Sequence, residues 1–489
     1  DRYLIKKENV KTNFLYQSAY QILTMLLPMV TSPYIARVLG ADGIGIYSYT
    51  YSIVSYFVLG AKLGLDNYGN RYIATVRDDQ EKLNHAFSDL YALHVVITLI
   101  VIGLYCGFVF KYGAAYKVIF AIQGFWLIGQ LLDINWLFFG IEKFKITVTR
   151  NTIVKMLTVV FIFVFVKTRN DTWKYILILA AGSAISESLV WLFLKQYVKI
   201  VKPNWRSYRI HLRPMLVLFI PSIAVSLYKI MDKIMLGSMT TTFEVGLYEN
   251  SEKIINICLG FVTALGTVML PRMSNMVATG QIEESKKLVK KSSLFILILS
   301  YAMGFGIIGV SGVFPSVFWG KEFVLCGTLM IGLAISLPFT AIANVVRTQI
   351  LIPQHKDNKY VLAVCMGALV NAVVNYVCIP RFNALGAVIG TICAEGVVCI
   401  IQLVAVQNDV PIWNYIIMSV PFALIGGLMA GMVMLIGNSL EISILTLCIQ
   451  VLIGGVLFCG ICFAYIAIWH KEILYILKCC LKKTIIKYK

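Results

Sequence analysis

The most unusual residues of this chain are charged side chains inside apolar segments that are long enough to cross a lipid bilayer. Lys229, Asp232 and Lys233 interrupt an apolar run that extends from Met215 to Met239. Insertion scales assign each such charge a cost of about 2.5–3.5 kcal/mol near the centre of a transmembrane helix. Charges retained at this cost face a wet cavity, pair with one another, or bind a charged substrate or ion.

Two of the lysines are predicted to lie at one level on adjacent helices. A helix that begins near Pro214 places Lys229 about 22 Å along its axis, because each residue adds about 1.5 Å. The return helix places Lys253 about 14 Å below its outer end by the same rise. Asp232 shares a helix face with Lys229 at a spacing of three residues, and Glu249 shares one with Lys253 at a spacing of four.

Three interpretations of this cluster follow from the residue types, namely substrate binding, structural ion pairing, and coupling to an ion. In the first, the ammonium groups of Lys229 and Lys253 bind the diphosphate of a substrate, because a lysine acts as a movable point charge for phosphate. In the second, Lys229 pairs with Asp232 and Lys253 pairs with Glu249, and these ion pairs only hold the two helices together. Lys233 lies nearer the outer surface, and we expect its side chain to extend to the interface.

Further charges lie at depth in other apolar segments. Lys155, Glu187 and Glu395 each fall within a predicted span, and Arg37 falls near the end of one. Each of these charges could also serve in helix packing or topology, and the carboxylates could bind a proton or Na⁺. The candidate substrate-binding residues are Lys229, Lys253, Lys155 and Arg37, and the candidate coupling or charge-pairing residues are Asp232, Glu187, Glu395 and Glu249.

The composition is that of an integral membrane protein. Of 489 residues, 59% are hydrophobic and 14% are charged, and the mean hydropathy is +0.80. Soluble proteins are about half apolar and about a quarter charged. Windows of about 20 apolar residues predict an all-α protein with about fourteen spans, in which prolines bend the helices without breaking them. The spans lie near 14–39, 43–65, 87–110, 115–139, 146–166, 173–194, 214–238, 244–270, 292–318, 323–351, 360–380, 384–406, 412–437 and 442–469.

The distribution of basic residues predicts the orientation. With the N-terminus in the cytoplasm, 29 of the 43 Lys and Arg residues fall on inner segments and eight on outer segments. This bias predicts a multi-pass membrane protein with both termini cytoplasmic. The net charge of +19 therefore indicates contact with anionic membrane lipids and gives no reason to expect a nucleic-acid partner.

An internal repeat predicts the domain organisation. RVLGADGIGIYS at 37–48 resembles KIMLGSMTTTFEVGLYE at 233–249, with Gly40 matching Gly237 and Tyr47 matching Tyr248. Two six-helix repeats with the same orientation are typical of transporters that rock two bundles about a central site. The predicted domains are an N-terminal lobe at 1–197, a basic cytoplasmic linker at 198–213, a C-terminal lobe at 214–408, two extra spans at 409–470 and a basic cytoplasmic tail at 471–489.

Several segments together resemble bacterial polysaccharide-export flippases of the multidrug/oligosaccharidyl-lipid/polysaccharide transporter superfamily. They are KKENVKTNFLYQ and PYIARVLGADGIGIYSYTYSI near the start, FFGIEKFK at 138–145, DKIMLG…VGLYENSEKI, and QILIP at 349–353. The resemblance implies two lobes in a V around a central cavity, alternating access, and an oligosaccharide on undecaprenyl diphosphate as the substrate. It also implies a polysaccharide polymerase and chain-length proteins as partners, and it transfers no individual residue role.

Other functions remain open at this point. The two extra spans also occur in relatives that flip lipid-linked cell-wall precursor, and a drug/cation antiporter would share the superfamily. A membrane glycosyltransferase or polymerase would need acidic residues on sizeable loops, whereas the outer loops are short, so we expect no enzyme activity. A scramblase or a structural membrane protein does not account for the repeat and the charges at depth. We expect no catalytic residue, no metal site and no cofactor beyond H⁺ or Na⁺ used for coupling.

The charge bias generates a first testable prediction, on topology. A membrane-impermeant thiol reagent added to intact cells should label cysteines introduced into the turn at 239–243. The same reagent should not label cysteines introduced at 281–287 or in the tail, because these segments are predicted to be cytoplasmic. Labelling of the tail in intact cells would reverse the predicted orientation.

Overall fold

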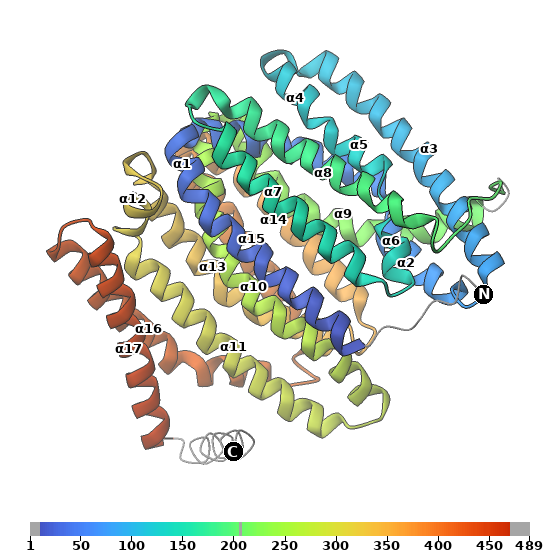
Figure 1. Cartoon of the computed structure of the whole chain (residues 1–489). Coiled ribbons are helices and arrows are strands. Elements are labelled where there is room, and N and C mark those ends of the chain that lie inside the picture. The colour runs from blue at the N-terminus through green and yellow to red at the C-terminus, as the bar shows by residue number, and fades with distance from the viewer. Residues whose placement is uncertain (1–9, 205–207, 470–489) are drawn as a thin grey trace, which may run out of the picture. The chain divides into compact units, whose positions relative to one another are not determined.

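The computed structural model describes residues 10–204 and 208–469, and this part of the chain folds into helices joined by short turns (Figure 1). Short 3₁₀ segments and a π-helical turn at Arg347–Leu351 complete it. The helices are α1 (Val10–Lys62), α2 (Leu65–Val76), α3 (Gln80–Tyr112), α4 (Lys117–Gln123), α5 (Phe125–Leu131), α6 (Asn135–Gly140), α7 (Phe144–Phe165), α8 (Thr172–Leu194), α9 (Tyr208–Met239), α10 (Thr242–Ala278), α11 (Ile282–Val310), α12 (Phe314–Phe318), α13 (Cys326–Val346), α14 (Asp357–Phe382), α15 (Ala384–Val406), α16 (Ile412–Ser439) and α17 (Ile444–Trp469).

The helices confirm the predicted all-α architecture. Among the described residues, eleven helical segments are long and apolar enough to cross a membrane. Each coincides with one of the predicted spans, and the remaining three predicted spans fall on α9 and on the two arms of α1. The protein is therefore a multi-pass membrane protein. The predicted basic tail at 471–489 lies outside the described residues.

A glycine, and no proline, separates the two arms of α1. The helix continues through Pro28 and Pro33, as expected, and departs from helical geometry at Gly40, where φ is 69° and ψ is −178°. Residues with a side chain rarely adopt this backbone conformation, so glycine is needed there. Gly237, its match in the repeat, has a different role: a Cβ atom at that position would lie 2.2 Å from the ring of Tyr49.

The chain forms two compact units, which are described separately. The first comprises residues 1–249 and 371–387, and the second comprises 250–370 and 388–489. The boundaries therefore fall inside α10, α14 and α15. The lobes at 1–197 and 214–408 divide the chain differently and stay a prediction.

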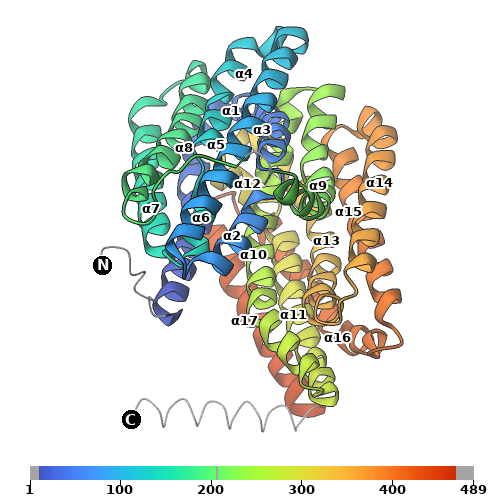
Figure 2. The same cartoon turned by 90° about the vertical axis from the view of Figure 1, so that its right-hand side faces the viewer.

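The core of the first unit includes the packing of α2 on α6, which lie side by side in Figure 2. Leu65, Gly69 and Ile73 recur every four residues of α2 and form its buried face. A Cβ atom on Gly69 would lie 3.0 Å from the indole of Trp136, and one on Gly140 would lie 2.5 Å from Ile73. These close approaches position α2 at the edge of the unit with its polar face exposed.

The second unit contains the two last helices as an integral part of its packing. α16 packs against both α11 and α17, and Figure 1 shows α16 and α17 side by side. A Cβ atom on Gly426 would lie 2.4 Å from the ring of Phe305, and one on Gly309 would lie 2.9 Å from Val433. Small residues allow this proximity, which is the usual basis of helix association in lipid.

Within the first unit, the two repeat segments contact each other reciprocally. A Cβ atom on Gly45 would lie 1.7 Å from the carbonyl oxygen of Thr242, and one on Gly246 would lie 1.9 Å from that of Ala41. Ala41 and Gly45 occupy the same places in the first segment as Thr242 and Gly246 in the second. A contact of this kind is expected where two similar segments are related by a local two-fold axis.

Polar side chains reinforce the same contact. Ser48 Oγ donates a hydrogen bond to Glu249 Oε2 at 2.7 Å, and these residues are 201 positions apart. The hydroxyl of Thr242 donates to Asp42 Oδ1 at 2.8 Å. The matched segments therefore meet through backbone proximity and through hydrogen bonds.

Candidate functional site: an intramembrane polar network

Asp232 lies in a buried cluster of neutral polar side chains. Its carboxylate accepts hydrogen bonds from Tyr248 Oη at 2.8 Å, from Asn371 Nδ2 at 2.8 Å and from Asn375 Nδ2 at 2.6 Å. Asp232 is only 3% exposed, whereas Lys229 is exposed and has no ion-pair partner among the described residues. The alternative that Lys229 and Asp232 form an ion pair is therefore wrong, because three neutral donors satisfy the carboxylate instead.

Lys233 faces a different partner from its neighbour Asp232. Lys233 Nζ lies 2.7 Å from Glu249 Oε2, and the two side chains are 17% and 13% exposed. The expectation that Lys233 extends to the surface is wrong, because Glu249 is within reach in the interior of the unit. Glu249 thus binds both Lys233 and Ser48.

The remaining predicted substrate-binding residues have varied surroundings. Lys155 is exposed, with Nζ 4.9 Å from the centre of the Tyr20 ring. Arg37 is exposed as well, whereas Lys253 is half-buried and its Nζ lies 3.3 Å from Asn250 Oδ1. Their roles as substrate contacts stay predictions.

Of the predicted coupling residues, Glu395 is 8% exposed and lies in α15, in the second unit. Its carboxylate is therefore enclosed by protein. A role in coupling, for this residue as for the other acidic residues, stays a prediction.

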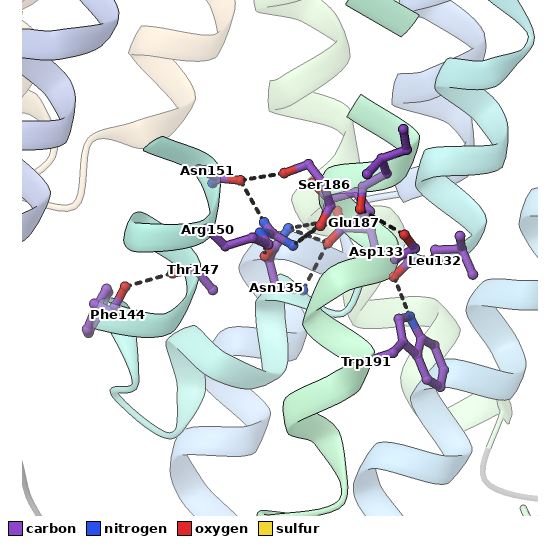
Figure 3. Close-up of polar contacts among 12 residues, drawn as sticks. Leu132, Asp133, Asn135, Phe144, Thr147, Arg150, Asn151, Ser186, Glu187 and Trp191 are labelled. Atoms are coloured by element: carbon purple, nitrogen blue, oxygen red, sulfur yellow. Dashed lines mark hydrogen bonds and ion pairs between the residues drawn. The ribbon is translucent and has the colours of Figure 1, made fainter. Parts of the chain in front are cut away.

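Glu187 belongs to the most extensive polar network that we find in the first unit (Figure 3). Arg150 on α7 places Nη1 3.2 Å from Glu187 Oε2 and 2.7 Å from the carbonyl oxygen of Ser186 on α8. The other guanidinium nitrogen, Nη2, donates to Asn135 Oδ1 at 3.0 Å and to Asn151 Oδ1 at 2.7 Å. The Arg150 side chain is only 4% exposed, so the partners of its charge are groups of the protein.

Asp133 extends this network toward α1. Its Oδ1 accepts hydrogen bonds from the backbone and side-chain nitrogens of Asn135, and its Oδ2 lies 3.4 Å from Lys62 Nζ. Asn135 Nδ2 also donates to Glu187 Oε2 at 2.7 Å, which joins the two parts. We call this set the Glu187 network; it comprises Lys62, Asp66, Asp133, Asn135, Arg150, Asn151, Ser186 and Glu187.

The Glu187 network surrounds a break in a membrane-spanning segment. The predicted span at 115–139 folds as α4, α5 and α6, and residues 132–134 between α5 and α6 are not helical. Carbonyl groups freed by such a break find no water in the apolar core of a bilayer and need internal donors. Here His94 Nε2 binds the carbonyl oxygen of Gln130 at 2.7 Å, Tyr91 Oη binds that of Leu131 at 3.1 Å, and Trp191 Nε1 binds that of Leu132 at 2.9 Å.

The side chains of this network are suited to binding a proton or a cation. It contains two basic and three acidic side chains, so its charges largely neutralise one another and it is not an anion site. Discontinuous helices in transporters supply ion or substrate sites near the middle of the membrane. Within the described residues, no group of three or more His, Cys, Asp and Glu side chains could hold a metal ion.

Several residues of these clusters escaped the sequence interpretation. The 29 basic residues on predicted inner segments include Arg150, but the structure buries its side chain. Asp133 and Asn135 fall inside the predicted span at 115–139, and the sequence pattern indicates no role for them. The spacing of Asn371 and Asn375 could have identified them, because two amides four residues apart in an apolar segment share a helix face.

The helices define a multi-pass membrane protein with charged side chains buried within its spans. A family model described as "Polysaccharide biosynthesis protein" matches residues 10–277, more than half of the chain. The chain belongs to this family, as the sequence resemblance predicted.

Named relatives agree with this assignment. A "Putative O-antigen transporter" from Shigella dysenteriae is 24% identical over 406 residues, which cover 82% of this chain and 100% of the relative. A protein of the same name from Escherichia coli (strain K12) is 23% identical over 416 residues, covering 82% of this chain and 98% of the relative. These relatives are named as transporters and not as enzymes.

Solved structures show a similar fold. The structure of "Lipid II flippase MurJ, inward closed conformation" has a TM-score of 0.75 and 14% identity, covering 94% of this chain and 100% of that chain. A transporter of the MOP superfamily from Pyrococcus furiosus has a TM-score of 0.52 and 14% identity, covering 83% and 96%. At these identities the likeness concerns the fold.

The Glu187 network leads to a prediction about stability. Arg150→Gln should lower the unfolding free energy by about 3–5 kcal/mol, because it leaves the enclosed Glu187 without its cationic partner. The double variant Arg150→Gln with Glu187→Gln should recover a large part of that loss, because no unpaired charge remains. The measurement is thermal unfolding of the purified protein in detergent, together with its abundance in the membrane.

Arg381→Gln is the matched control, because Arg381 is an exposed arginine on α14. It should leave the unfolding temperature unchanged. If the double variant were no more stable than Arg150→Gln alone, the ion pair would not be the source of the stability.

Proposed function

We propose that this protein moves oligosaccharide repeat units linked to undecaprenyl diphosphate from the inner to the outer leaflet of the bacterial plasma membrane, for assembly of a surface polysaccharide. The main support is the family match over residues 10–277. The 24% identity to a named O-antigen transporter along its entire length adds to it. Alternating access between the two sides, with both chain termini in the cytoplasm, is part of this proposal.

The charges provide the physical basis for such transport. A diphosphate with attached sugars cannot cross the apolar core unaided, because desolvating each charge costs several kcal/mol or more. Lys229 is an exposed cation in α9 without an ion-pair partner in the described part of the chain. In this proposal its ammonium group binds the diphosphate. Asp232, held by three neutral donors, instead orients the α9 segment that carries Lys229.

Coupling to an ion gradient would use the enclosed carboxylates. Asp232 and Glu249 lie on adjacent helices, and both are bound to other side chains of the first unit. Uptake of a proton or of Na⁺ by one of them would change these contacts. This assignment is part of the proposal and extends the role suggested for the acidic residues by the sequence.

The proposed function is tested by deleting the gene. Cells should lose the surface polysaccharide, and lipid-linked repeat units should accumulate on the inner leaflet. In the deletion strain, the Lys229→Gln variant should support at least about tenfold less transport than the natural protein at equal membrane abundance. Lys287→Gln, which removes an exposed charge from α11, should complement fully.

Three results would reject parts of this proposal. Absence of accumulated intermediates would assign the protein to synthesis of the repeat unit. Accumulation of the lipid-linked cell-wall precursor alone would identify the alternative substrate. Full complementation by Lys229→Gln would remove Lys229 from the substrate site while leaving the transport function intact.

Alternating access makes a further prediction for the contact between the repeat segments. If that contact opens during transport, a disulfide between Asp42→Cys and Thr242→Cys should stop transport, and a reductant should restore it. These side chains are within hydrogen-bonding distance, so their replacement by cysteines allows a bridge. The twelve native cysteines would first be replaced.

Each single-cysteine variant serves as the control and should transport normally under oxidising conditions. Undiminished transport by the fully cross-linked protein would mean that the contact between the repeat segments is permanent.

A further inference from the structure

A pocket of about 500 Å³ lies between the amphipathic helix α2 and the first turns of α9, entirely within the first unit. It differs chemically from the Glu187 network, because its lining is mainly apolar and its charged side chains are all basic. Two arginines, Arg71 and Arg213, line it together with Tyr68, Tyr72, Val217 and Leu218.

The two helices are held at a defined spacing beside this pocket. Gly64 precedes α2 with φ +79°, and a Cβ atom there would lie 2.5 Å from the carbonyl oxygen of Met215. Tyr68 Oη and His211 Nδ1 are hydrogen-bonded at 2.8 Å. The rings of Tyr68 and Tyr72 stack with centres 5.8 Å apart. The pocket is thus built on a rigid aromatic wall.

The arginines of the pocket lack anionic partners. Arg71 and Arg213 are exposed, and neither forms an ion pair or a hydrogen bond with the described residues. By contrast, Arg77 pairs with Glu142 at 2.8 Å, although it also lies close to α2. Two uncompensated guanidinium groups on one pocket attract an anion, and guanidinium matches phosphate oxygens in geometry.

The apolar residues of the lining also favour a ligand that has an apolar portion. Val217 and Leu218 form one wall of the pocket. The surface of α9 continues with exposed apolar side chains at Leu216 and Ile220, which are 41% and 58% exposed. A free phosphate would leave this wall without a partner, whereas an acyl chain would cover it. Both α2 and the start of α9 belong to segments predicted to be cytoplasmic, where the leaflet carries anionic lipid.

We propose that this pocket binds one anionic glycerophospholipid of the inner leaflet. The phosphodiester lies between Arg71 and Arg213, the headgroup contacts the aromatic wall, and an acyl chain follows Val217 along α9. The bound lipid bridges α2 to α9. This site is independent of the transported substrate, so it stands whether or not the proposed function holds.

The experiment uses the full-length protein, purified in detergent and stripped of lipid. Binding of short-chain phosphatidylglycerol is measured by native mass spectrometry and by isothermal titration calorimetry. One tight site is expected. Short-chain phosphatidylcholine should bind at least about tenfold more weakly, because its choline group cancels the negative charge. Glycerol 3-phosphate should bind more weakly still, because it lacks the acyl chains.

Variants assign the site. Arg71→Gln with Arg213→Gln should weaken phosphatidylglycerol binding at least about tenfold. The control is Arg209→Gln with Arg272→Gln, which removes the same charge from exposed arginines that do not line the pocket, and it should bind as the natural protein does. Thr75→Trp, which fills the pocket and keeps both arginines, should also abolish binding.

Three outcomes would overturn the proposal. Equal losses in the two double variants would indicate only general charge attraction. Binding of glycerol 3-phosphate as tight as that of the lipid would identify a simple anion site. Unchanged binding by Thr75→Trp would place the lipid elsewhere.

Discussion

The structure depends on one constraint, which is that polar groups inside a bilayer must find their partners within the protein. The break at residues 132–134 illustrates it most clearly. The side chains of His94, Tyr91 and Trp191 bind the carbonyl groups of three successive residues, 130–132, beside the break. Asp133, at the break itself, is bound by Asn135 and approached by Lys62. The helices that surround the break are therefore joined by hydrogen bonds as well as by packing.

The same constraint sorts the charges into two groups. Arg150 and Lys233 each have an enclosed carboxylate as partner, and these pairs contribute to the architecture of the first unit. Lys229, Arg71 and Arg213 are exposed cations without ion-pair partners among the described residues. The second group has charge available for an external anion. This distinction is the physical basis for placing a substrate contact at Lys229 and a lipid at the other two.

Glycine determines where helices approach most closely. At Gly45 and Gly246 the two repeat segments touch through their backbones, and neither position has room for a side chain. A contact that uses backbone proximity and few side chains can separate with little loss of buried apolar surface.

Hydropathy and the repeated motifs were sufficient to predict the all-α fold, the approximate spans and the family, because lipid imposes a length and an apolar composition on every crossing helix. Hydropathy and motifs did not predict which side chains bind the buried charged residues. Asp232 and Lys233 are adjacent in the chain, yet Asp232 binds Asn371 and Asn375 from α14, whereas Lys233 binds Glu249 from α10. Helical spacing identifies neighbours on the same helix, and for this reason it suggested Lys229 as the ion-pair partner of Asp232. Partners on other helices depend on how the helices pack and rotate, and that packing is established only when the whole chain is folded.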